Sequence, residues 1–242
     1  MKTKGEIMNL PVIAKVYFHF NPEVLDKINS LKNKTRKSLF KPIFKNDEIN
    51  FFSWLSEMKF GIFFDSLNFE LEYSPKVNKQ TLDWQLKKDN EIIFAEVLRL
   101  NLHNSLMEEQ IKELKERYRN KDKPQAPIIT SYTSGTMNME NFYGKKSKLT
   151  DKEFKYRSFA TTYKHPFILC VDCSEPRLFL DYLDFEDYFI GGNKGLFYTN
   201  KDFGENVSGI LIRNMWNQTL FLNNSNAIHT IKNDTIQNFN VK

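Results

Sequence analysis

The chain has 242 residues, a formal net charge of +5 and a 14% content of aromatic residues, including 22 phenylalanines. This length can bury a sizeable core in one domain, and the aromatic content excludes a disordered chain. The mild positive charge permits binding to a polyanion but does not by itself indicate one. No apolar run approaches the roughly 20 residues needed to span a bilayer. Because no signal-peptide pattern is visible either, we expect a cytoplasmic protein with no membrane partner.

The first 46 residues are expected to form an N-terminal extension. β-Branched and aromatic residues at positions 10–20 predict a first strand or extended arm. Asn21-Pro22-Glu23 predicts the start of a helix, because proline is favoured in the first turn. A basic stretch at residues 32–45 follows. Contact with nucleic-acid phosphates and a solvated linker are equally good interpretations of it.

Residues 51–100 contain a helix and a β-hairpin around which the chain is organised. Helical spacing of apolar residues predicts a helix over residues 51–66, and a strand is expected at 68–73. Two further strand-like runs, 81–86 and 91–100, flank Asp89-Asn90, residues that accept the positive φ of a tight turn. If these two residues form the loop, Lys88 pairs with Glu91. Counting outward then places Asp83 directly opposite Glu96.

Asp83 and Glu96 are the strongest candidates for a metal site. Side chains that face each other across an antiparallel pair lie roughly 5 Å apart at Cβ, and two carboxylates so placed repel unless a cation lies between them. Oxygen ligands of this kind suit Mg²⁺. The alternative is an ordinary solvated pair on an exposed sheet face. However, Glu96 alternates with apolar residues of the strand, and a carboxylate embedded there needs a partner.

Glu57 is a third candidate acid, on the preceding helix. On a helical wheel it lies between Trp54, Gly61 and Phe64, away from the solvated edge. A surface glutamate beside an aromatic ring is the alternative interpretation.

The order of these elements resembles the PD-(D/E)XK, or restriction-endonuclease-like, nuclease superfamily. The motif stands here as Leu82-Asp83, twelve intervening residues, then Glu96-Val97-Leu98. The resemblance implies a central mixed β-sheet flanked by helices, an α/β (α+β mixed sheet) fold over residues 47–223. It also implies that Asp83 and Glu96 hold Mg²⁺ or Mn²⁺, with the Val97 carbonyl close by and Glu57 completing the site.

The chain departs from the family pattern at two positions. Leu82 replaces the motif proline, and Leu98 stands where the family has a lysine that orients the attacking water. The family tolerates relocation of this lysine to the following helix, so Lys115 and Lys112 become candidates on a helix expected at residues 105–119. Gln110, beside the buried stripe of that helix, is a further candidate for the site.

The resemblance therefore implies a metal-dependent endonuclease that acts on nucleic acid, with DNA preferred over RNA, and by analogy a role in defence against foreign DNA. An inactive nuclease-like fold that binds nucleic acid or a partner protein is the alternative suggested by Leu98. Metal-assisted chemistry on another phosphate ester is a third. Homodimerisation is left open by the sequence.

The remainder of the chain is expected to complete the sheet. An insertion at about 120–165 has no strong period, and its mixed basic and aromatic residues suit either a flap that contacts nucleic acid or a helical decoration. A buried strand at 165–172, a helix at 183–190 and strands at 208–215 and 219–223 follow. Residues 224–242 are expected to form an irregular tail. The C-x-x-C pair Cys170 and Cys173 lacks a second pair of ligands, so we expect reduced structural thiols.

Overall fold

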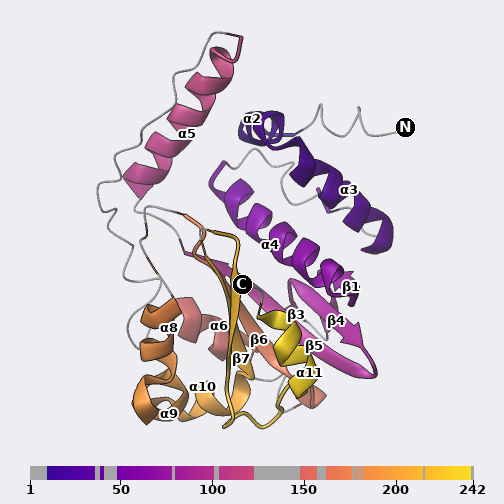
Figure 1. Cartoon of the computed structure of the whole chain (residues 1–242), viewed down its shortest axis with the longest axis vertical. Coiled ribbons are helices and arrows are strands. Elements are labelled where there is room, and N and C mark those ends of the chain that lie inside the picture. The colour runs from indigo at the N-terminus through magenta and orange to yellow at the C-terminus, as the bar shows by residue number, and fades with distance from the viewer. Residues whose placement is uncertain are drawn as a thin grey trace.

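The computed structural model describes residues 10–35, 39–40, 48–77, 80–100, 104–122, 148–156, 162–175, 178, 180, 182–214 and 216–240. Its centre is a six-stranded mixed sheet with the strand order β1-β4-β5-β6-β7-β8, and helices flank the sheet (Figure 1). This architecture confirms the predicted mixed α/β fold.

The strands of the central sheet are β1 (Glu70–Tyr73), β4 (Trp84–Lys88), β5 (Glu91–Arg99), β6 (Phe167–Asp172), β7 (Gly209–Arg213) and β8 (Thr219–Asn223). The three central strands β5, β6 and β7 are parallel, whereas β1, β4 and β8 pair antiparallel with their neighbours. Every residue of β6 is buried, as expected for a parallel strand covered on both faces. A separate pair, β2 (Lys76–Val77) and β3 (Gln80–Thr81), precedes β4, so the predicted strand at 81–86 is interrupted at Leu82 and Asp83.

The helices are α2 (Val12–Phe20), α3 (Pro22–Thr35), α4 (Glu48–Ser66), α5 (Asn104–Arg119), α6 (Lys148–Tyr156), α8 (Tyr182–Phe189), α9 (Leu196–Thr199), α10 (Lys201–Asn206) and α11 (Asn233–Phe239), with a 3₁₀ turn η4 (Gly191–Asn193). Helix α4 packs on one face of the sheet, where Gly61 lies against the ring of Trp84. Helix α6 covers the opposite face, where the ring of Tyr156 lies 5.9 Å from that of Phe167. Helices α2 and α3 lie on the far side of α4 from the sheet, and α5 projects away from it (Figure 1). No helix in the described part of the chain is long and apolar enough to span a bilayer.

The expected strand at residues 10–20 is wrong, because this segment forms helix α2. Its β-branched and aromatic residues favour a strand locally, but Ile13, Ala14, Val16 and Phe18 are buried together on the helix. The ring of Phe18 lies 6.1 Å from that of Phe51 on α4. Burial of one helical face against α4 therefore outweighs the local β-propensity.

The expected irregular tail is also wrong over part of its length, because residues 233–239 form helix α11. Glu91 anchors its start: one carboxylate oxygen accepts a hydrogen bond from the Lys232 backbone N–H (3.0 Å) and the other from the Thr235 hydroxyl (2.8 Å). At the other end, the ring of Phe239 lies 5.3 Å from Phe221 on β8. Contacts with residues far away in sequence therefore stabilise a helix that the polar local sequence does not predict. Within the insertion, the structure describes helix α6 and a short helical stretch at residues 162–163. The basic residues 41–45 lie outside the described residues.

Candidate active site

The turn of the β4–β5 hairpin sets the register that brings the motif acids together. Asp89 and Asn90 have φ values of 48° and 64°, as a two-residue type I′ loop requires. The paired residues run from Lys88 with Glu91 to Trp84 with Ala95, which confirms the predicted register. The next step outward places Asp83 opposite Glu96.

Asp83 immediately precedes β4, and its side chain takes the place of a backbone partner for β5. Its Oδ2 atom accepts a hydrogen bond of 2.7 Å from the backbone N–H of Val97. Because the N–H and C=O of one strand residue point to the same side, the Val97 carbonyl also faces Asp83. The structure thus brings the backbone of Val97 beside the first motif acid.

Of the two motif acids, Glu96 is buried and Asp83 is partly buried. Burial raises the pKa of Asp83 well above its usual value, and the charges of Glu57 and Glu96 raise it further. Glu96 belongs to the buried residues of β5, and its Oε2 atom has no hydrogen-bond partner among the described residues. One buried and one partly buried carboxylate, with an unpartnered oxygen on Glu96, form a site that favours a cation.

Glu57 joins this group from helix α4. Its Oε2 accepts a hydrogen bond of 2.8 Å from the Tyr73 hydroxyl, and its backbone carbonyl accepts one of 3.0 Å from the Trp84 indole N–H. Burial raises the pKa of Glu57 to about 7, and the nearby charge of Glu96 contributes in the same direction. The partly buried side chain therefore lies near enough to Glu96 for the two charges to interact.

Lys152 of helix α6 supplies a cation to the three acids. Its Nζ forms an ion pair with Oε1 of Glu96. Although burial lowers the pKa of Lys152, the charges of Glu96, Asp83 and Glu57 together raise it above the usual value. A lysine from the insertion therefore lies against Glu96, two residues before Leu98 in the sequence.

Helix α6 is held in place by contacts on two sides. The Tyr156 hydroxyl donates a hydrogen bond to the Thr81 carbonyl (3.0 Å). The Gln80 side-chain amide donates one to the Lys155 carbonyl (2.6 Å). Glu153, one residue after Lys152, accepts a hydrogen bond of 3.2 Å from Asn206 of α10. These bonds tie α6 to β3 and α10, and they place Lys152 over β5.

The candidates on helix α5 lie elsewhere. Lys115 forms an ion pair with Glu48 at the start of α4, at 2.6 Å. The Gln110 amide donates a hydrogen bond of 2.8 Å to Glu175. Lys112 lines a surface groove beside Glu48 and Lys115. The structure therefore does not bring these three residues to Asp83 and Glu96, although it brings Glu57 there.

The sequence holds only a weak signal for Lys152. It belongs to the basic and aromatic run of the insertion, where Leu149, Glu153 and Tyr156 recur at helical spacing and are buried. Lys152 and Tyr156 are four residues apart, so they lie on neighbouring positions of the helix surface. The only indication of a role for Lys152 in the sequence was its position beside an acid on the apolar face of an amphipathic helix.

The donor set has the chemistry of a site for a hard divalent cation, but its ligands are not fully assembled. Among the residues that the structure describes, no group of three or more His, Cys, Asp or Glu side chains is arranged to hold a metal ion. Asp83 and Glu96 nevertheless provide the oxygen ligands that Mg²⁺ and Mn²⁺ prefer. The unpartnered Oε2 of Glu96 shows that one of these oxygens is still available within the described structure. The residues present therefore fit such an ion.

Comparisons with known proteins provide a distant structural likeness. No family model matches the chain, and no curated protein matches it. Among solved structures, the chain resembles one chain of a CdiA-CT/CdiI toxin and immunity complex from Burkholderia pseudomallei, with a TM-score of 0.36 and 7% sequence identity. The match covers 73% of this chain and 89% of that chain. The likeness assigns no role to any residue here, so the functional argument rests on the geometry of Glu57, Asp83, Glu96 and Lys152.

Proposed function

We propose that the chain is a divalent-metal-dependent nuclease that hydrolyses phosphodiester bonds, with DNA as the preferred substrate over RNA. One observation carries this proposal: the ammonium group of Lys152 lies against Glu96, in the environment of Asp83 and Glu57. The group supplies the positive charge that the motif lacks at Leu98. The proposal thus combines three acids with a lysine that comes from a different element.

Each residue of the site has a chemical role in this proposal. Asp83, Glu96 and the Val97 carbonyl would hold Mg²⁺ or Mn²⁺, which would lower the pKa of a bound water and stabilise charge on the phosphate. Lys152 would donate a hydrogen bond to a phosphate oxygen or to the attacking water. Glu57, with a pKa of about 7, can accept or release a proton near neutral pH while Tyr73 holds its Oε2 in place.

The electrostatics of the site support binding of a cation rather than a purely structural role. Three acids face one lysine, so the ionised group carries a net charge of −3 + 1 = −2. Burial of such an excess raises the pKa of Asp83 and Glu57, which disfavours the metal-free ionised state. A bound divalent ion would offset the electrostatic cost of ionising these acids, which would account for their placement close together.

The test is a cleavage assay on supercoiled plasmid, linear duplex DNA, single-stranded DNA and structured RNA, with Mg²⁺, Mn²⁺ or EDTA. The native chain is compared with Asp83→Asn, Glu96→Gln and Lys152→Met. Lys115→Met is the matched control, because it removes a lysine that pairs with Glu48 away from the site. We expect metal-dependent cleavage that falls at least about 100-fold in the first three variants, as for loss of groups that act together, and is unchanged in the control. Full activity of Lys152→Met would refute the role of this lysine.

A second function is supported by the same ion pair. Lys152 occupies Oε1 of Glu96, an oxygen that a metal would need, so the pair can also close the site in a fold that binds nucleic acid or a partner protein without cutting it. In that case no substrate is cleaved with any metal, while salt-dependent binding of nucleic acid remains. A role in defence against foreign DNA belongs to the first function and depends on the cleavage result.

A further inference from the structure

A second cluster of charged residues lies at the carboxyl ends of the three parallel strands. Arg99 of β5 pairs in register with Asp172 of β6, which pairs in register with Arg213 of β7. Residues in register across a sheet project to the same face, so the three side chains form one row. Open α/β sheets commonly bind ligands at this edge. The row lies three residues beyond Glu96 along β5, on the opposite face of the strand.

The acid at the centre of the row is already satisfied by hydrogen bonds. One carboxylate oxygen of Asp172 accepts a hydrogen bond of 3.0 Å from the Ser174 N–H, and the other accepts one from the Ser56 hydroxyl of α4. Glu175, which follows β6, accepts the amide of Gln110. Although burial opposes it, the charges of Lys59 and Arg213 hold the pKa of Asp172 below its usual value. Asp172 therefore stays ionised, and its charge attracts the cations around it.

Two of the cations retain donors without partners. Arg213 donates through Nη2 to the Asn217 side chain, but its Nη1 is buried and has no hydrogen-bond partner among the described residues. Lys59 of α4 is partly buried, and its charge acts on Asp172, yet it forms no hydrogen bond or ion pair with any residue whose placement the structure gives. Lys59, Arg99 and Arg213 against Asp172 and Glu175 leave a charge of 3 − 2 = +1. Unpartnered donors with a surplus of positive charge have the chemistry of a site for an anion.

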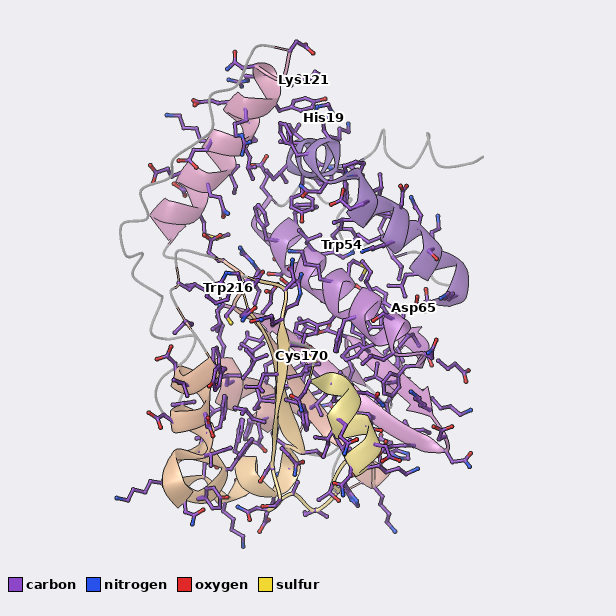
Figure 2. All side chains as sticks on the ribbon, in the orientation of Figure 1. His19, Trp54, Asp65, Lys121, Cys170 and Trp216 are labelled. Atoms are coloured by element: carbon purple, nitrogen blue, oxygen red, sulfur yellow. The ribbon has the colours of Figure 1, made fainter. Side chains whose placement is uncertain are left out.

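An exposed indole stands at the same edge. Trp216 lies in the β7–β8 turn, three residues after Arg213, and is 63% exposed. The side-chain oxygen of Asn214 accepts hydrogen bonds from the backbone N–H groups of Trp216 and Gln218, each 3.0 Å long, which hold the turn in one shape. In Figure 2, Trp216 lies at the end of the sheet nearest α4 and α5. An aromatic face beside cations is the combination that proteins use to bind single-stranded nucleic acid.

We propose that this edge is a substrate subsite for a single-stranded segment of nucleic acid, in which Lys59 and Arg213 bind a backbone phosphate and Trp216 stacks on an unpaired base. The subsite deepens the proposed nuclease function and rests on it, since it names the form of the substrate. Arg99 lies three residues beyond Glu96 along β5, about 10 Å at ~3.3 Å per residue. Because Arg99 and Glu96 project to opposite faces of the sheet, a nucleic-acid strand held here would reach the acids by passing around the ends of the β-strands, within a site of several nucleotides.

The test measures binding in EDTA, where cleavage does not contribute. Fluorescence anisotropy is recorded for a labelled 12-nucleotide single strand and for a duplex of the same length, with the native chain, Lys59→Met, Trp216→Ala and Trp216→Phe. Lys201→Met removes an exposed lysine on α10 and is the matched control. Thermal unfolding of each variant identifies any that fail to fold, and Trp216→Phe keeps an aromatic ring in case the alanine variant is unstable.

We expect Trp216→Ala to weaken single-strand binding between about 5-fold and 150-fold, the range for loss of one stacked base. Trp216→Phe should retain most of the affinity. Lys59→Met should reduce the slope of log K against log salt by about 0.7, as for loss of one phosphate contact on a single strand. The duplex should bind more weakly than the single strand and respond little to Trp216→Ala.

Native-like binding by both Lys59→Met and Trp216→Ala would overturn the subsite, and so would an equal effect of Trp216→Ala on duplex and single strand. These results are independent of the cleavage assay. Cleavage that needs Asp83, without any effect of Lys59 or Trp216 on binding, would leave the nuclease and remove the subsite. Binding that needs Lys59 and Trp216, without cleavage by the native chain, would leave the subsite and remove the nuclease.

Discussion

Replacement of Lys152 by methionine tests two contributions of this lysine by separate measurements: its effect on stability and its effect on cleavage. The Glu96 side chain is 3% exposed and that of Lys152 is 28% exposed. The methionine would leave the buried Glu96 side chain without the cation that it pairs with. Loss of one partner from a buried ion pair costs about 3–5 kcal/mol. Because Lys152 is partly open to solvent, we expect a loss of about 2–4 kcal/mol in the free energy of unfolding, or about 4–16 °C in the melting temperature at ~2–4 °C per kcal/mol.

The second half of this experiment adds Glu96→Gln to the same chain. The glutamine removes the buried charge, so the double variant should recover most of the lost stability, with a coupling free energy of about 2 kcal/mol or more. Cleavage should fall by at least about 100-fold in both single variants, and the double variant should not recover it. Urea unfolding followed by tryptophan fluorescence measures stability, and plasmid cleavage with Mg²⁺ measures activity.

The matched control is Lys115→Met. Lys115 and Glu48 also form a close ion pair, but their side chains are 31% and 32% exposed, so the pair should contribute only about 0–1 kcal/mol. A loss below about 0.5 kcal/mol for Lys152→Met, or no recovery in the double variant, would refute the buried ion pair. Cleavage that is lost in Lys115→Met and kept in Lys152→Met would indicate that Lys115 of helix α5, and not Lys152, acts as the catalytic lysine.

Three further predictions concern stability. Glu57 has a folded-state pKa of about 7 against a usual value of 4.5, so the folded chain binds more protons than the unfolded chain between these pH values. Its stability in EDTA should therefore fall as pH rises through this range. Urea unfolding midpoints measured from pH 5 to 8 should fall less in Glu57→Gln than in the native chain, and an unchanged fall would contradict the assignment. Gly61→Ala would place a Cβ 2.3 Å from the Trp84 ring, so we expect the free energy of unfolding to fall by about 1–3 kcal/mol. The shift of α4 should also displace Glu57 and weaken cleavage. Native stability of this variant would show that α4 can move to accommodate the methyl group. Glu91→Ala would remove the acceptor for the Lys232 N–H and the Thr235 hydroxyl, so α11 should become sensitive to limited proteolysis. The free energy of unfolding should fall by about 2 kcal/mol. Unchanged proteolysis would argue that Glu91 does not hold α11 in place.

Much of the candidate site follows from neighbours within a few residues. The Asp89-Asn90 turn decides the hairpin register, because only a few residue types accept two consecutive positive φ angles. Strand periodicity then places Asp83 opposite Glu96, and helical periodicity turns Glu57 toward the sheet. The order of strands and helices also predicted the mixed sheet. The division of the chain into an extension, a core and a tail remains a prediction.

The errors occur where distant contacts decide the structure. Helix α2 forms from residues with a strand-like composition, since α4 offers a surface for one helical face. Helix α11 forms from a polar tail, since Glu91, more than 140 residues away, holds its first turn. Local propensity is weaker than burial and hydrogen bonds of this kind.

The choice of lysine illustrates the same limit at the level of function. Lys112, Lys115 and Lys152 carry the same charge on helices of similar composition, so no local pattern distinguishes them. Lys152 meets Glu96 across 56 residues because hydrogen bonds from Tyr156 and Gln80 hold α6 against β3. The acids of the site were therefore determined by the sequence through turn geometry and periodicity. Its cation was decided only by the tertiary structure, because packing of the insertion selects which of many equivalent ammonium groups becomes buried beside them.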